Sequence, residues 1–549
     1  MKLTTTLKPL ASLVIKLLAG LAWLLFIVGC QRYQHTVRQV PTAPANASTV
    51  TNYTDSTLTL AAGSHYKRGT LHTMLYGKHY RKAWYTPVPV KVLDIGTVQG
   101  GLTPTELGGS RQTISMRAIT HDSIEYVLRS VDKEPAGALS PRFQKSYIAN
   151  IARDATSATH PYAALVLPDM AKAIGVYHTE PELYYVPHDP RLGEYAETIG
   201  GTMVLLERRP DGDQSDNPTM GNAKKVKSTR SMLTERLTDN DTRIDARNYL
   251  RARLFDMLIG DWSRHEDNWR WAEIKLKDKA YTYRPVPRDR DNVFYKLHDA
   301  PIPWITRLLD YKPHFRTYRK SVPNLKKLNY NARHLDALIL AELTEQDWLE
   351  IADSVKNTLT DEVIEDAFKA MPDTIHQLTA KPIISKLKHH RDRTQQFARE
   401  YFTILAKEAI VVGSDKHEQF IVTALNKDEV QVQVYKTTKK GEVKEQLFNR
   451  TCHKKETAQL ILYGLSGEDQ FILRGDTSPA IKVSIWGGDG EDTYTSEDNS
   501  KNTGSKICIT DSTYGNKYKT DKKVNVKKDD NLRAKDFTAS GWLLRFYLD

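Results

Sequence analysis

The hydrophobic pattern of this 549-residue chain changes twice along its length, and these changes limit the folds that it can adopt. Strand-like runs dominate from about residue 75 to 210, whereas helical spacing dominates from about 242 to 410. After about residue 412, apolar and polar residues alternate, which is typical of β-strands. At roughly 150 residues per domain, the length allows three to four units. The sequence therefore predicts an α+β protein.

An apolar run from Leu10 to Val28 follows two lysines and is closed by Gly29 and Cys30. A charged start, an apolar middle and a small residue are the features of an export signal. The ending resembles a bacterial lipobox, which implies cleavage before Cys30 and attachment of lipid to that cysteine. The alternative is an uncleaved transmembrane helix, since a run of this length can cross a bilayer. Either way, we expect export to the cell envelope, and the preferred lipobox interpretation places a lipid anchor in the outer membrane.

The overall composition excludes a polytopic membrane protein, because the mean hydropathy is -0.53. The formal net charge of +12 would suit a phosphate-bearing partner, nucleic acid or an anionic membrane. No basic aromatic repeat supports nucleic-acid binding, so the expected partners are membrane lipid, through Cys30, and an envelope protein. Apart from Cys30, only Cys452 and Cys508 are present, too few for a disulfide framework or a structural zinc site.

The densest polar cluster of the chain, GDWSRHEDNWRW, spans Gly260–Trp271 and directly follows an apolar helical stretch. A short predicted hairpin comes next, and then the segment PRDRDNVF at Pro287–Phe294. A helix, a charged loop with an Asn, a hairpin and an Asp pair occur in this order in protein-kinase-like phosphotransferases. There the loop supplies the base and a metal-binding Asn, and the later Asp holds Mg²⁺.

The charged loop resembles the D-R-H-x-x-N catalytic loop of atypical kinases, namely the phosphatidylinositol-kinase, HipA and secretory-pathway kinase relatives. Pro287–Phe294 is similar to the D-x-D-x-x-F metal motif of CotH-type spore-coat kinases. The stretch from about 63 to 500 also resembles a family of exported Bacteroidetes proteins, a likeness that implies no particular activity. Together these resemblances imply a two-lobed kinase-like core with a β-rich N-lobe and a helical C-lobe, and Mg²⁺ and ATP as cofactors.

On this resemblance, Asp261 and Asn268 are the candidate catalytic residues, and Asn268, Asp289 and Asp291 are the candidate Mg²⁺ ligands. The chain departs from the family pattern, because the catalytic Asp is expected five residues before Asn268, where Ser263 stands. A serine cannot serve as the same base, so Asp261 takes that role only if the loop is shifted. The open alternative is a buried structural network beneath the tryptophans, formed by Asp261, Arg264, His265 and Asp267.

Two upstream features fit the same resemblance. A glycine-rich stretch lies where kinase-like folds place their phosphate cover, and Tyr126–Pro135 resembles the third strand of phosphatidylinositol-kinase-like enzymes. Arg129 stands where those enzymes have a phosphate-binding Lys, and an arginine can pair with phosphate through two hydrogen bonds. The alternative is that Arg129 is an ordinary surface residue of a strand. The candidate nucleotide-binding residues are Gly100, Gly101, Gly108, Gly109, Arg129 and Lys133.

Near the C-terminus, Tyr463–Phe471 and Trp486–Tyr494 align residue by residue with an offset of 23. A period of this length indicates a solenoid turn. The second copy also fits the nonapeptide of calcium-binding parallel β-rolls, which would make Asp489 and Asp492 Ca²⁺ ligands. Such rolls stack many nonapeptides directly, whereas here a strand separates two partial copies. The preferred interpretation is therefore the Gly-Asp turns of an ordinary β domain.

A polar stretch at Pro210–Arg230 has the composition of a loop and separates the β-rich part from the helical part. The residues before the first strands lack periodicity and are rich in Thr, Ala, Pro and Asn, as expected of a tether. The predicted segments are a signal peptide (1–29), the tether (30–60), a β-rich N-lobe (61–210), a mainly helical C-lobe (211–410) and a small all-β C-terminal domain with a Lys-rich tail (411–549).

The sequence leaves two functions open. One is phosphoryl or nucleotidyl transfer from a Mg²⁺-bound nucleotide by a membrane-anchored exported enzyme. The other is a non-catalytic envelope protein that keeps the kinase-like fold and binds a partner. The motifs H-E-x-x-H, G-x-S-x-G and G-x-x-x-x-G-K-[ST] do not occur. Their absence excludes zincin proteases, serine hydrolases with a nucleophile elbow and P-loop NTPases.

Overall fold

The computed structural model describes residues 20, 52–108, 113–276, 280–297, 299–308, 314–475, 478–497, 506–530 and 537–547. Cys30, the predicted tether before residue 52 and Gly109 lie outside these residues. Among the described residues, no helix has the length and apolar character needed to cross a membrane. The chain divides into two compact units. The N-terminal unit holds Trp84–Ser157, Leu183–Leu206 and the residues up to Arg68, and the C-terminal unit holds Gly69–Ala83, Ala158–Glu182 and Glu207–Asp549.

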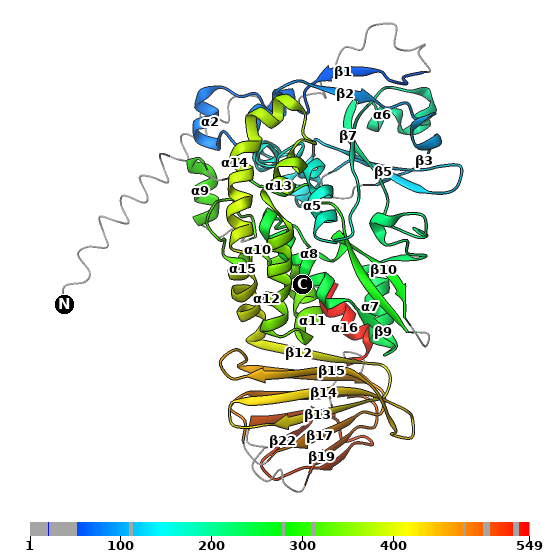
Figure 1. Ribbon diagram of the computed structural model, residues 1–549, viewed down its shortest axis with the longest axis vertical. Helices are drawn as coiled ribbons and strands as arrows, with labels where there is room; N and C mark the ends of the chain where they lie inside the picture. Colours follow the sequence, from blue (N-terminus) through cyan, green and yellow to red (C-terminus); the bar gives the residue numbers. More distant parts are fainter. Residues whose placement is uncertain are drawn as a thin grey trace, which may run out of the picture. The chain divides into compact units, whose positions relative to one another are not determined.

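A seven-stranded sheet is the centre of the N-terminal unit (Figure 1). The strand order is β1-β2-β6-β7-β5-β4-β3, in which β3, β4 and β5 form an antiparallel meander. In β2, buried valines alternate with exposed residues, as a strand with one covered face requires. The strands are β1 (Thr57–Leu60), β2 (Val88–Val92), β3 (Thr103–Gly108), β4 (Ser115–Ile119), β5 (Glu125–Ser130), β6 (Glu182–Val186) and β7 (Thr202–Arg208), and the helices are α4 (Tyr147–Ala155) and α6 (Ala196–Ile199).

Helices dominate the first part of the C-terminal unit. Thr344 and Asp347 cap α12 through reciprocal hydrogen bonds, and α13 ends at Phe368, shortly before Pro372. The helices are α2 (Thr70–Tyr76), α3 (Arg81–Tyr85), which begins in this unit, α5 (Leu167–Ala173), α7 (Thr229–Thr238), α8 (Ala246–Ile259), α9 (Pro301–Leu308), α10 (Leu325–Leu328), α11 (Arg333–Ile339), α12 (Glu345–Thr358), α13 (Asp361–Phe368), α14 (Asp373–Asp392) and α15 (Thr394–Ala406).

A small four-stranded sheet packs within the same unit, in the order β8-β10-β11-β9. Its centre is the predicted hairpin that follows the charged loop, and the antiparallel pairing of β10 with β11 confirms that prediction. The hairpin therefore fixes the two ends of the charged region, since the loop leads into β10 and the PRDRDNVF segment follows from β11. The strands are β8 (Val226–Ser228), β9 (Thr242–Ile244), β10 (Trp269–Lys275) and β11 (Tyr281–Pro287).

The C-terminal part of this unit is a stack of strands (Figure 1). From β16 onward, successive strands alternate between two sheets, and each pairs in parallel with the strand two positions later. The strands are β12 (Glu408–Ser414), β13 (Glu418–Ala424), β14 (Glu429–Thr437), β15 (Val443–His453), β16 (Gln459–Ser466), β17 (Gln470–Arg474), β18 (Lys482–Asp489), β19 (Thr493–Ser496), β20 (Ile507–Asp511), β21 (Lys517–Lys519) and β22 (Asn525–Lys528), and helix α16 (Ala539–Tyr547) follows.

This arrangement is a parallel β-solenoid, and the 23-residue offset of the sequence is the length of one coil. Phe471 pairs with Tyr494 across that offset. The rings of Phe420, Phe471, Tyr494 and Tyr518 stack in succession at centroid distances of 4.8, 5.1 and 5.1 Å. The Gly-Asp turns predicted for this β region join its stacked coils. The broader α+β prediction is confirmed.

Candidate functional site

The charged loop begins where α8 ends. Residues on every face of α8 are buried, which is typical of a helix at the centre of a large unit. Gly260 ends the helix with a φ of 71°, and a Cβ at this position would lie 2.7 Å from the ring of Tyr318. The chain then turns through the loop and a short 3-10 turn, Glu266–Asn268, into β10. The loop is thus held between a buried helix and a paired strand.

Arg264 is the centre of this loop, with only 1% of its surface exposed. Its guanidinium donates to the carbonyl oxygens of Asn268 at 3.0 Å, Arg288 at 2.6 Å and Asp289 at 3.0 Å. Its Nε lies 3.0 Å from Oδ2 of Asp261, in an ion pair that is equally buried. One side chain therefore ties the charged loop to the PRDRDNVF segment.

The two candidate catalytic residues, Asp261 and Asn268, meet at Ser263. Oδ1 of Asp261 accepts hydrogen bonds from the backbone N–H of Ser263 at 3.0 Å and from its hydroxyl at 2.6 Å. The amide of Asn268 donates to the carbonyl oxygen of Ser263 at 2.8 Å. These bonds, together with the Arg264 ion pair, are those of a structural network. His265 and Asp267, which the sequence assigned to the same network, are half-buried and exposed instead.

A second buried network, which the sequence analysis did not identify, lies within α8 and its neighbours. Arg253 donates to Asp336 at 2.8 and 3.1 Å and to Asp256 at 2.9 Å. Asp336 also accepts from the hydroxyls of Tyr249 at 2.7 Å and Tyr401 at 2.6 Å. The available signal was Arg253 and Asp256 within the largely apolar second half of α8, since charged residues are rarely buried without partners.

Asp256 joins the two networks. Its carboxylate accepts from Arg290 at 2.9 Å and lies 3.9 Å from Nε of Arg264, in addition to its bond with Arg253. Burial lowers the pKa of the Arg290 guanidinium, while Asp256 opposes that change. A continuous set of buried charges therefore runs from α8 to the segment after β11.

The candidate metal ligand Asp289 has an unusual backbone, with a φ of 59°. Its side chain is half-buried, and its carbonyl oxygen is the one that Arg264 binds. Asp291 is also half-buried and accepts a hydrogen bond from the amide of Asn292 at 3.1 Å. Across the described parts of the chain, no group of three or more His, Cys, Asp or Glu side chains is arranged to hold a metal ion.

His265 of the charged loop interacts electrostatically with Asp289. Burial lowers the pKa of His265, while Glu266, Asp267 and Asp289 oppose that change. The imidazole is therefore predominantly neutral at neutral pH.

The candidate nucleotide-binding residues that the structure describes all belong to the N-terminal unit. Gly100 and Gly101 have φ values of 81° and 98° in the turn before β3, whereas Gly108 ends that strand. Between Gly101 and Gly108 the chain forms β3, so this part of the glycine-rich stretch is a turn followed by a strand. Gly108 pairs with Ser115, which pairs in turn with Arg129 on β5. The meander thus places Gly108 and Arg129 on one line across three strands.

Lys133 follows β5 in a tight turn. Its backbone N–H donates to the carboxylate of Asp132 at 2.8 Å, and the hydroxyl of Tyr66 donates to the same oxygen at 2.7 Å. Burial raises the pKa of Asp132, while the nearby His65 opposes that change. The side chain of Asp132 therefore shapes the turn that carries Lys133.

The candidate calcium ligand Asp492 has a clear role in the solenoid. Its Oδ1 accepts the backbone N–H of Asp469 at 2.8 Å, and in the same way Asp469 accepts from Glu418 and Asn516 accepts from Asp492. Each of these side chains thus binds the backbone of the coil before it. Burial raises the pKa values of Asp469 and Asp492, and neighbouring carboxylates raise them further. Asp489 is exposed, so this geometry favours a structural turn.

We expect Asp492→Asn to raise the melting temperature at about pH 8 and to change it little at about pH 4. Because the pKa of Asp492 is raised in the folded protein, the unfolded chain ionises first as the pH rises above about 4, and stability is lost. Asparagine cannot ionise, and Asn516 already fills the equivalent position one coil later. Thermal melting from pH 4 to 8 measures the effect, with the exposed Asp489→Asn as the control.

A lower melting temperature of Asp492→Asn at every pH would contradict this expectation. Repeating the melts with millimolar Ca²⁺ and with Mg²⁺ separates the calcium interpretation, because only a bound ion stabilises the parent protein by mass action.

No protein-family model and no curated protein matches the chain. Among solved structures, it is similar to the Rio2 kinase from Chaetomium thermophilum, in a complex described as ADP/Mg²⁺-phosphoaspartate. The identity is 13%, the match covers 53% of this chain and 71% of that chain, and the TM-score is 0.20. At this TM-score, the similarity carries no argument about fold or function.

Proposed function

We propose that this chain is a lipid-anchored protein of the bacterial cell envelope whose kinase-like core binds a partner and does not transfer phosphate. The observation that carries the proposal is the buried contact of Asp261 with Ser263 and Arg264. The lipid anchor at Cys30 and the kinase-like core rest on the sequence motifs alone.

A general base must lie within hydrogen-bond reach of the proton that it removes from a substrate. Asp261 is 1% exposed, and its two carboxylate oxygens face Ser263 and Arg264. Ser263 occupies the position expected for the base, and its own hydroxyl is bound to Asp261. Neither side chain is therefore placed to receive a proton from a substrate hydroxyl, and the loop serves to hold the unit together.

The second candidate function is Mg²⁺- and nucleotide-dependent phosphoryl or nucleotidyl transfer, and one observation favours it. Asp289 has a left-handed φ, and strained backbone of this kind is concentrated at functional sites. Asp289, Asp291 and Asn268 offer the hard oxygen atoms that Mg²⁺ prefers. In this function, ATP would be the second cofactor, and the metal would neutralise charge on its phosphates.

Asp289→Asn distinguishes the two functions. Under the proposal, we expect the variant to keep the parent's melting temperature, because the side chain is half-buried and asparagine tolerates a left-handed backbone well. Calorimetric titration of the parent with ATP and Mg²⁺ is then expected to show no metal-dependent binding.

Asp291→Asn is the matched control, since it removes the same charge two residues away. Metal-dependent ATP binding by the parent that Asp289→Asn abolishes would overturn the proposal in favour of phosphotransfer.

A further inference from the structure

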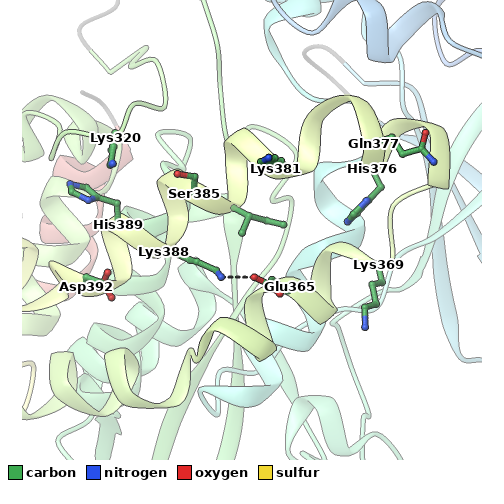
Figure 2. A pocket seen from close by; sticks show the side chains of 11 residues that line it. Lys320, Glu365, Lys369, His376, Gln377, Lys381, Ser385, Lys388, His389 and Asp392 are labelled. Carbon is green, nitrogen blue, oxygen red and sulfur yellow. Dashed lines mark hydrogen bonds and ion pairs between the residues drawn. The ribbon is translucent and has the colours of Figure 1, made fainter.

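A basic groove of about 700 Å³ lies along α14 in the C-terminal unit. Gln377, Lys381, Ser385 and His389 are spaced four residues apart on that helix and so share one face. Figure 2 shows these side chains in order along α14, with Lys320 near His389 and with Glu365 from α13 across the groove. The groove is thus formed by one long helix, the neighbouring α13 and the segment that carries Lys320.

The carboxylates of the groove already have partners. Glu365 lies 2.5 Å from Nζ of Lys388, which also lies 2.9 Å from Asp361. Asp392 lies 2.8 Å from Nε of Arg391. The negative charges at the groove are therefore balanced by cations on the same two helices.

The remaining cationic and donor side chains of the groove are not satisfied in this way. Among the residues that the structure describes, no hydrogen bond or ion pair is made by the side chains of Lys320, Lys381, Ser385 or His389. Partial desolvation lowers the pKa of His389, and the cations Arg393 and Lys320 lower it further while Asp392 opposes them. The open side of the groove therefore carries an excess of positive potential and several unused donors.

We propose that this groove binds a phosphate group, carried either by a small soluble phosphate ester or by a lipid headgroup. A phosphate offers several acceptor oxygens to separate donors, and lysine is a common point-charge partner for it. Lys381 and Ser385 supply donors from α14, Lys320 supplies one from the segment near His389, and Ile384 gives an apolar contact for the group that carries the phosphate. The proposal goes beyond the proposed function and does not depend on it, because no residue of the charged loop lines the groove.

Titration of the full chain with inorganic pyrophosphate and with glucose 6-phosphate tests the soluble source. Co-sedimentation with phosphatidylcholine vesicles that contain phosphatidic acid tests the lipid source, with pure phosphatidylcholine as the blank. We expect binding in at least one arm, and we expect Lys381→Gln and Lys320→Gln each to weaken it by about tenfold or more, because a hydrogen bond from a charged donor is lost.

Both lysines are exposed, so neither variant should lower the melting temperature. Lys439→Gln, at an exposed lysine after β14, is the matched control and should bind as the parent does. Binding to vesicles but not to pyrophosphate or glucose 6-phosphate would identify the lipid source and support the proposal. Absence of binding in both arms, or binding that the two groove variants leave unchanged, would overturn it.

Discussion

Arg253→Met is expected to lower the free energy of unfolding of the C-terminal unit by roughly 3–5 kcal/mol, the cost of breaking a buried ion pair on one side. Arg253 is fully buried and binds Asp336, Asp256 and Asn329 at once. Methionine has a similar reach but leaves two buried carboxylates short of a donor. Denaturant unfolding followed by tryptophan fluorescence measures the loss.

Arg399→Met is the matched control for that experiment. Arg399 is 62% exposed on its side chain and lies 3.1 Å from Glu345 on the surface of the helices. An exposed pair contributes at most about 1 kcal/mol, so this variant should unfold almost as the parent does. Equal losses for the two variants would mean that the Arg253 network does not stabilise the unit.

Arg264→Met is expected to be destabilising to a similar extent, roughly 3–5 kcal/mol, since it leaves Asp261 buried without its cation. It also leaves the carbonyl oxygens of Asn268, Arg288 and Asp289 without the donor that joins the charged loop to the PRDRDNVF segment. Arg264→Lys keeps the charge but cannot reach several acceptors with a planar fork, so an intermediate loss is expected.

The same denaturant experiment checks the Arg264 variants, again with Arg399→Met as the control. An unchanged unfolding free energy for Arg264→Met would contradict a structural role for the charged loop. In that case the charges of the loop would not be needed for stability, and the phosphotransfer function would gain support.

Local patterns predicted much of the C-terminal unit correctly. The hairpin after the charged loop and the change from helix to strand between α15 and β12 each depend on neighbouring residues. The solenoid was harder to predict, because only two of its coils carry a clear repeat and an inserted hairpin, β14–β15, hides the first one. Parallel pairing joins residues far apart in the sequence, and apart from the 23-residue repeat no pattern of neighbouring residues indicates it.

In the candidate site too, contacts between residues close in the sequence could be predicted, and contacts between distant residues could not. Asp261 and Arg264 lie within four residues, so the sequence could present a network of these two side chains as one alternative for the loop, whereas the bonds to Ser263 were not predicted. The partner of Arg253 lies 83 residues away, at Asp336, and spacing along the chain gives no indication of it. The strand between Gly101 and Gly108 was missed because glycines flanking a short polar segment are more typical of a loop.

Adjacent coils of the solenoid are joined by hydrogen bonds and stacked rings, and this determines where the region can change in length. Phe420 and Phe471 stack although 51 positions separate them, while the next stacked pair is one 23-residue coil apart. After an insertion, the next coil only has to bring its aromatic ring into the stack and its Asp or Asn side chain to the backbone of the coil before it. Because the entropy cost of closing a loop rises slowly with its length, a new segment can be inserted between two coils with only a small loss of stability. The solenoid is therefore a suitable place to graft a loop, with the β14–β15 hairpin as the natural example.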